Sequence, residues 1–143
     1  MRYSDYEIFL ATVKHSGTRA VRAQLRSERK RFLQCHTIPE ALIYAEQLPA
    51  MTTLRDPKLV AQSWIKNAGN RFVNKQYDDD WEEQWTIWHT LVTQFDAEVV
   101  NIATSGLPVV GAHRDQTAIP DEDLPWDKIE FANNLITDAG LIL

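Results

Sequence analysis

The chain has little cysteine and no long apolar run, and each scarcity excludes a class of protein. A single cysteine, Cys35, excludes an internal disulfide framework and fits a reducing compartment. No stretch approaches the roughly 18 apolar residues that a membrane span requires. No charged segment followed by an apolar run opens the sequence, as a secretory signal would. These features predict a protein without a membrane partner, cytoplasmic or incorporated in an intracellularly assembled particle.

Signatures of catalysis, metal binding and cofactor binding are also missing. The five glycines are scattered, so no glycine-rich phosphate loop is recognised. No zinc-ligand spacing is shared by the four histidines, His15, His36, His89 and His113. The best remaining candidate for a polar site is the His-Arg-Asp sequence at 113–115. We therefore predict a protein that is not an enzyme and that needs no cofactor and no metal.

Charge, by contrast, is abundant and strongly polarised along the chain. Residues 1–75 contain 13 Lys/Arg and 6 Asp/Glu (+7), whereas residues 76–143 contain 2 and 14 (−12), which sum to the net charge of −5. Such asymmetry indicates a charged partner or association between copies. Internal neutralisation between the basic half and the acidic half explains it equally well.

Hydrophobic periodicity predicts a single all-α domain over residues 1–143. The clearest helix runs from about residue 81 to 98, where Asp80 can cap the first turn and Glu83 completes a capping box. Its apolar face consists of five residues at helical spacing, Trp81, Trp85, Trp88, Val92 and Phe95. Residues in this pattern are typical of a core.

Further helices are predicted at residues 3–15, 19–35, 41–48, 57–69 and 125–138. Residues 71–77 and 99–103 are ambiguous between helical and extended conformations. With little β-signal, the expected architecture is a bundle of five or six amphipathic helices. One long loop at about 104–124 interrupts it, and loops of this length tend to be functional.

The helix predicted at 19–35 carries a basic stripe. It consists of Arg19, Arg22, Arg26, Arg29 and Lys30, at spacings of three and four. Apolar residues lie opposite, which makes the helix amphipathic. Three interpretations are open: a solvated surface, a phosphate-contacting face for nucleic acid, or a contact for an acidic protein.

Residues 9–25, with their Ser-Gly-Thr-Arg-Ala break, resemble the first two helices of the helix-turn-helix in LysR-type regulators. That family would next have a turn and a separate recognition helix. Here residues 27–31 continue the same helical pattern, so membership is not assigned. The resemblance favours the nucleic-acid interpretation of the basic stripe.

An acidic face and four apolar anchors complete the candidate contact residues. The acidic face comprises Asp78, Asp79, Glu82, Asp121, Glu122 and Asp123. The anchors are Trp81, Trp126, Leu141 and Leu143. Tryptophan is enriched at binding hot spots, and an apolar chain end is expected to dock on a surface.

These features together predict a non-catalytic assembly or adaptor protein. Charge-polarised contacts with copies of itself, as a homo-oligomer, or with a larger complex would suit a viral or mobile-element structural component. One alternative is a nucleic-acid-binding protein that uses the basic helix at 19–31. Another is an acidic inhibitor or immunity-type protein that binds a basic partner.

Overall fold

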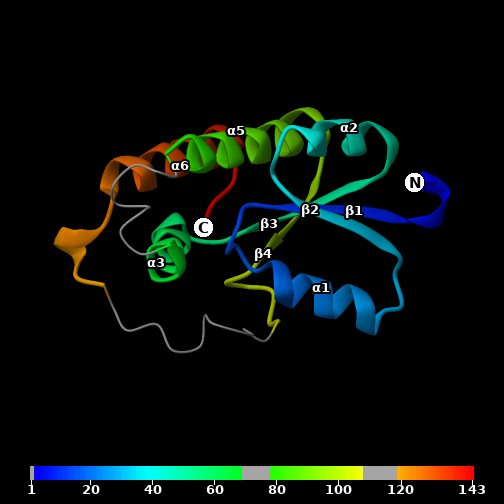
Figure 1. Cartoon of the computed structure of the whole chain (residues 1–143), viewed down its shortest axis with the longest axis horizontal. Helices are drawn as coiled ribbons and strands as arrows, with labels where there is room; N and C mark the ends of the chain where they lie inside the picture. The colour runs from blue at the N-terminus through cyan, green and yellow to red at the C-terminus, as the bar shows by residue number, and fades with distance from the viewer. Residues whose placement is uncertain (1, 69–77, 108–118) are drawn as a thin grey trace.

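The computed structural model describes residues 2–68, 78–107 and 119–143, and a parallel β-sheet lies at its centre (Figure 1). The sheet has the strand order β2-β1-β3-β4. Every pairing between neighbouring strands is parallel. The strands are β1 (Ile8–Thr12), β2 (Phe32–His36), β3 (Ala50–Leu54) and β4 (Glu98–Asn101).

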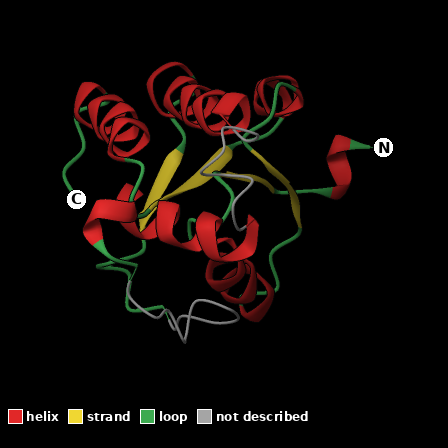
Figure 2. Cartoon of the chain, turned by 60° about the vertical axis from the view of Figure 1, so that its left-hand side comes forward, coloured by secondary structure: helices red, strands yellow, loops and turns green. Residues whose placement is uncertain are grey.

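Helices cover both faces of this sheet (Figure 2). Those in the described ranges are α1 (Thr18–Ser27), α2 (Glu40–Gln47), α3 (Pro57–Ala68), α5 (Asp78–Gln94) and α6 (Trp126–Asp138), with short 3-10 helices η1 (Tyr3–Asp5) and η3 (Asp121–Asp123). α1 lies on one face, and α2 and α5 lie on the other (Figure 1). Right-handed crossovers between parallel strands produce this arrangement, because β2 and β3 lie on opposite sides of β1.

The predicted all-α bundle is wrong, because residues 8–12, 32–36, 50–54 and 98–101 are strands. Parallel strands are buried on both faces, so they read as continuous apolar runs rather than as an alternation. A run of five such residues cannot be distinguished from a buried helix by periodicity. In β1, Phe9, Leu10 and Ala11 are all 0% exposed.

Two predicted helices are affected in particular. Residues 3–15 contain η1 and β1, and residues 19–35 contain α1 followed by β2. The resemblance of residues 9–25 to a helix-turn-helix is therefore wrong, because the first of its two helices is replaced by strand β1. The helices predicted at 41–48, 57–69 and 125–138 correspond to α2, α3 and α6, and the one predicted at 81–98 corresponds to α5, which ends at Gln94. Residues 99–101 belong to β4, whereas residues 71–77 lie outside the described part of the chain.

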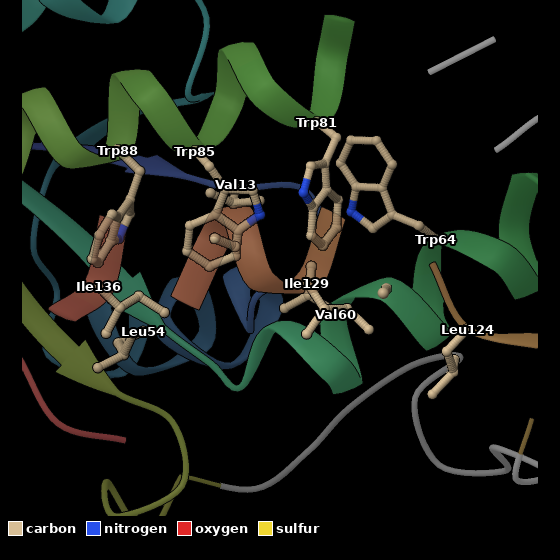
Figure 3. Close-up of a cluster of buried hydrophobic side chains, with 12 residues drawn as sticks. Val13, Leu54, Val60, Trp64, Trp81, Trp85, Trp88, Leu124, Ile129 and Ile136 are labelled. Atoms are coloured by element: carbon tan, nitrogen blue, oxygen red, sulfur yellow. The ribbon is translucent and has the colours of Figure 1, made fainter. Parts of the chain in front are cut away.

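The largest apolar cluster lies where α3, α5 and α6 pack against the end of the sheet (Figure 3). Trp81, Trp85 and Trp88 of α5 are each 0% exposed. The ring centroids of Trp64 and Trp81 are 5.2 Å apart, and those of Trp85 and Trp88 are 5.4 Å apart. The aromatic face of α5 is therefore core.

Within the described ranges, no helix combines the length and the apolar character that crossing a membrane demands.

Candidate anion-binding site

The loop that joins β1 to α1 occupies the point at which the strand order reverses. From β1 the chain continues to β2 on one side and then crosses to β3 on the other. In open parallel sheets ligands bind at such a switch point, outside the carboxyl ends of the strands. The order 2-1-3-4 places that point between β1 and β3.

The β1–α1 loop, residues 13–17, ends at a helix N-terminus that no side chain caps. Gly17 precedes α1 in a left-handed conformation with a φ of +98°, and it makes no side-chain cap hydrogen bond. The first amides of a helix have no partner within the helix, and the positive end of its dipole attracts anions. Together these features make the start of α1 suitable for an oxyanion.

Side chains from α3, α5 and the end of β3 hold the backbone of this loop. The indole Nε1 of Trp64 donates to the Lys14 carbonyl at 2.7 Å. The Lys14 N–H donates to Oε1 of Gln84 at 2.8 Å. Nη1 of Arg55 donates to the His15 carbonyl at 2.9 Å. The loop is therefore fixed by three elements distant in sequence.

The hydroxyl groups of the loop are used internally. Ser16 is 1% exposed, and its Oγ donates to the Val13 carbonyl at 2.5 Å. The same Oγ lies 2.6 Å from Oγ1 of Thr53. Oγ1 of Thr12 and Oγ1 of Thr18 are also 2.6 Å apart. These contacts join the loop to β1, β3 and α1, so they support the site rather than face a ligand.

A cleft of about 290 Å³ opens beside this loop. Its lining residues come from the loop, α1, β2 and the end of α3, and they are Lys14, His15, Thr18, Arg19, Arg22, Gln34, His36 and Asn67. Three of them are Lys or Arg, and none is acidic. A concave surface lined by positively charged side chains concentrates a positive potential and favours an anionic ligand.

Two nitrogen atoms on residues of the cleft are buried without a partner. Nε of Arg22 and Nδ1 of His36 have no hydrogen-bond partner among the described residues. A buried polar group left unpaired is costly, so such atoms are uncommon. Both atoms are enclosed by protein and do not open into the cleft themselves, but the planar guanidinium of Arg22 carries further N–H groups whose geometry matches a phosphate group.

Burial lowers the pKa of His36. Its interaction with the backbone of Thr12 opposes this shift, and the nearby Lys14 ammonium reinforces it. The imidazole is therefore neutral at neutral pH. An anion bound beside it would favour the protonated form and raise its pKa.

This lowered pKa predicts a pH-dependent contribution to stability. Below about pH 6.5 the unfolded chain binds more protons at this histidine than the folded chain does, so the free energy of unfolding falls. We expect His36→Gln to lose less stability than the wild type between about pH 7.5 and about pH 5, because it lacks this titration. Urea denaturation of both proteins at the two pH values measures the difference. Identical losses would contradict the assignment.

The structure divides the predicted basic stripe into two parts. Arg19, Arg22 and Arg26 all lie on α1 and line a second cleft, of about 300 Å³. α1 ends at Ser27, and Arg29 follows in a left-handed conformation with a φ of +56°. Arg29 and Lys30 line neither of these clefts. The five residues form one stripe only if the helix continues past residue 27, and α1 ends there.

The acidic residues lie on other elements. Glu82 is exposed on α5, and η3 contains the exposed Asp121, Glu122 and Asp123. Oδ1 of Asp121 pairs with Nζ of Lys58 at 3.3 Å. Residues 78 and 79 (Asp78 and Asp79) begin α5, but their side chains are outside the described part. Because α1 and α5 lie on opposite faces of the sheet, the basic stripe does not face the start of α5 (Figure 1).

The four predicted anchors differ in exposure. Trp81 is 0% exposed, whereas Trp126 is 47% exposed and Leu143 is 51% exposed. Leu141 is partly buried against the largest apolar cluster, which contains Trp81. The indole Nε1 of Trp126 donates to the Asp121 carbonyl at 2.8 Å. Contact of these residues with a partner, and assembly through them, stay predictions.

Two further chemical groups bear on function, the free thiol and possible metal ligands. Burial, with a smaller effect of Glu40, raises the pKa of the Cys35 thiol to about 11. Little reactive thiolate is therefore present at neutral pH. The described residues contain no group of three or more His, Cys, Asp or Glu placed to hold a metal ion. The candidate at 113–115 lies outside the described residues.

Comparisons with protein-family models, with curated proteins and with solved structures find no match to this chain. The class is therefore set by the fold and the cleft alone: an open parallel α/β protein with a cationic cleft at the carboxyl ends of β1 and β2.

The sequence prediction identified Arg19 and Arg22 but missed Lys14, Gly17 and His36 as parts of one site. It places residues 16–18 as a break between two helices. The available signal was an apolar run at 8–13, followed by a short polar segment with Gly17 and then an amphipathic helix. A strand, a glycine-containing loop and a helix in this order are typical of phosphate-binding units.

Proposed function

We propose that this protein binds a phosphate-bearing small molecule, of the mononucleotide class, in the cleft beside the β1–α1 loop. The observation that carries the proposal is the position of three Lys or Arg side chains, with no acidic residue among the described residues that line the cleft, at the carboxyl ends of β1 and β2. The uncapped start of α1 supplies amides for the phosphate oxygens. In other open parallel sheets, nucleotide phosphates bind at the turn after the first strand and at the start of the helix that follows.

The electrostatic balance of the cleft supports an anion rather than a neutral ligand. Lys14 and Arg19 are exposed, and Arg22 is half-buried. No ion pair among the described residues involves any of these three side chains. Neighbouring cations repel one another, and a phosphate group would remove that repulsion while it accepts their hydrogen bonds.

Calorimetric titration with inorganic phosphate and with AMP tests the proposal. Both ligands are expected to bind, and adenosine, which has no phosphate, is expected to bind much more weakly than AMP. Arg19→Ala and Lys14→Ala should each weaken binding by about tenfold or more, because each removes a charge-assisted contact. Arg29→Ala is the matched control, since Arg29 lies outside the cleft. No binding of either phosphate ligand, or equal losses in all three variants, would overturn the proposal.

A further inference from the structure

The cationic surface continues beyond the proposed phosphate site. The second cleft is lined by Arg19, Arg22 and Arg26, and it shares the first two of these with the cleft at the β1–α1 loop. The three residues occupy one face of α1, at spacings of three and four. The two clefts therefore form one continuous cationic strip, from the start of α1 toward its end.

The three arginines lack acidic neighbours to neutralise them. No ion pair among the described residues involves Arg19, Arg22 or Arg26. The acidic residue nearest to them in sequence, Glu28, accepts a hydrogen bond from Gln24 instead. A row of like charges on a helix is destabilising in isolation. Its presence here points to a ligand that carries several negative charges.

The far end of the strip is also ordered. The guanidinium carbon of Arg26 lies 5.9 Å from the centroid of the Phe32 ring, which places the cation over an aromatic face of β2. Arg26 is seven residues after Arg19, which is about 10 Å along the helix axis. A phosphate group in the cleft at the start of α1 leaves Arg26 without an anion, because Arg26 does not line that cleft.

We infer that the ligand carries at least two phosphate groups in a row, the first in the cleft at the β1–α1 loop and the next between Arg22 and Arg26. This inference rests on the proposed phosphate site and extends it to a polyphosphate. Two sources have this chemistry: a nucleotide or inorganic polyphosphate, and a single nucleic-acid strand with a terminal phosphate. Both present consecutive phosphates, and both would contact the strip in the same order.

The test compares three probes by competition titration: inorganic phosphate, tripolyphosphate and a short 5′-phosphorylated single-stranded oligonucleotide. The variants are Arg26→Ala and, as a control, Arg29→Ala, which removes the same charge outside both clefts. We expect Arg26→Ala to weaken tripolyphosphate binding by about tenfold and to leave inorganic phosphate unaffected. If the natural ligand is a nucleic-acid strand, the negative slope of log affinity against log salt for the oligonucleotide should become less steep by about 0.7 in Arg26→Ala, because one phosphate contact is lost.

The outcomes separate the two proposals. Phosphate binding with equal effects of Arg26→Ala and Arg29→Ala on every probe would overturn the extension and leave the phosphate site intact. No binding of inorganic phosphate at any concentration would overturn the phosphate site itself. Tripolyphosphate and oligonucleotide that both bind tighter than phosphate, and both respond to Arg26→Ala, support the extension. Arg26→Gln, which removes the charge but keeps a polar side chain with part of the aliphatic stem, and thermal denaturation of each variant exclude misfolding as the cause.

Discussion

Replacing Gly17 with alanine is expected to lower the free energy of unfolding by about 2–4 kcal/mol, from backbone strain and overpacking together. Gly17 has a φ of +98°, which residues with side chains rarely adopt. A Cβ atom there would lie 2.5 Å from Cγ1 and 2.6 Å from Cδ1 of Ile102. The loop would have to move away from the segment after β4, so phosphate binding should weaken in the same variant. Urea denaturation and calorimetric titration with inorganic phosphate measure the two effects.

Gly106 provides a matched control for this substitution. Its φ is +73°, but nothing lies within 4 Å of a Cβ added there. Gly106→Ala should therefore show only the backbone strain, about 1 kcal/mol, and unchanged phosphate binding. Adding Ile102→Ala to Gly17→Ala should recover part of the steric loss, which a double-mutant cycle measures. Equal destabilisation by the two glycine variants, without any recovery, would show that the contact with Ile102 does not matter.

The part of the fold that the sequence predicts well consists of its amphipathic helices. α5 is the clearest case: Trp81, Trp85 and Trp88 fall at helical spacing and are all 0% exposed. α3 begins at Pro57, the predicted first residue of that helix, and Oδ1 of Asp56 accepts the Lys58 N–H at 3.0 Å. Such helices are readable because one face is apolar and the other is polar, with a local cap at the start.

The sheet is harder to read, because β1 is apolar on both faces and the other strands, at four or five residues, are too short for an alternation of apolar and polar residues to stand out. β2 is the hardest case, since Phe32–His36 follow α1 after only four residues and continue its apolar pattern. The turn between them depends on Arg29, a non-glycine residue with a φ of +56°. No turn-forming glycine or proline marks this position. The pairing of β1 with both β2 and β3 is a tertiary property that no local pattern encodes.

The site depends on the sheet, and its prediction failed for the same reason. Lys14 and His36 are distant in sequence but lie at the carboxyl ends of two adjacent strands. Only the parallel pairing of β1 and β2 brings them into one cleft with Arg19 and Arg22. The periodicity of α1 identified the arginines as a group, yet it gave no reason to connect them with a loop. That connection follows from the strand order.

Helix α5, which carries Trp81, Trp85 and Trp88, also contributes to the site, although it contains none of the residues that line the cleft. Gln84 of α5 accepts the Lys14 N–H, and the Trp88 indole donates to the carbonyl of Thr53, whose hydroxyl contacts Ser16. The core helix therefore positions the β1–α1 loop from the opposite face of the sheet. Loss of core packing should consequently reach the cleft.

Trp85→Ala is expected to have the largest effect on stability, a loss of about 3–5 kcal/mol, because a large cavity replaces a fully buried ring. The rings of Trp81, Trp85 and Trp88 form a row along α5. The centroid of the central Trp85 ring lies 5.9 Å from that of Trp81 and 5.4 Å from that of Trp88. A domain has only about 5–15 kcal/mol of net stability, so this variant should unfold at a much lower urea concentration. Urea denaturation followed by circular dichroism measures the shift.

Phenylalanine substitutions separate the volume of these rings from their hydrogen bonds. The indole N–H of Trp81 donates to the Lys128 carbonyl at 2.9 Å, and that of Trp88 donates to the Thr53 carbonyl at 2.8 Å. The Trp85 N–H is buried without a partner among the described residues. Trp88→Phe should therefore cost about 1–3 kcal/mol more than Trp85→Phe, because it leaves a buried carbonyl without its donor. Equal costs at the two positions would mean that ring volume alone sets the contribution of this row.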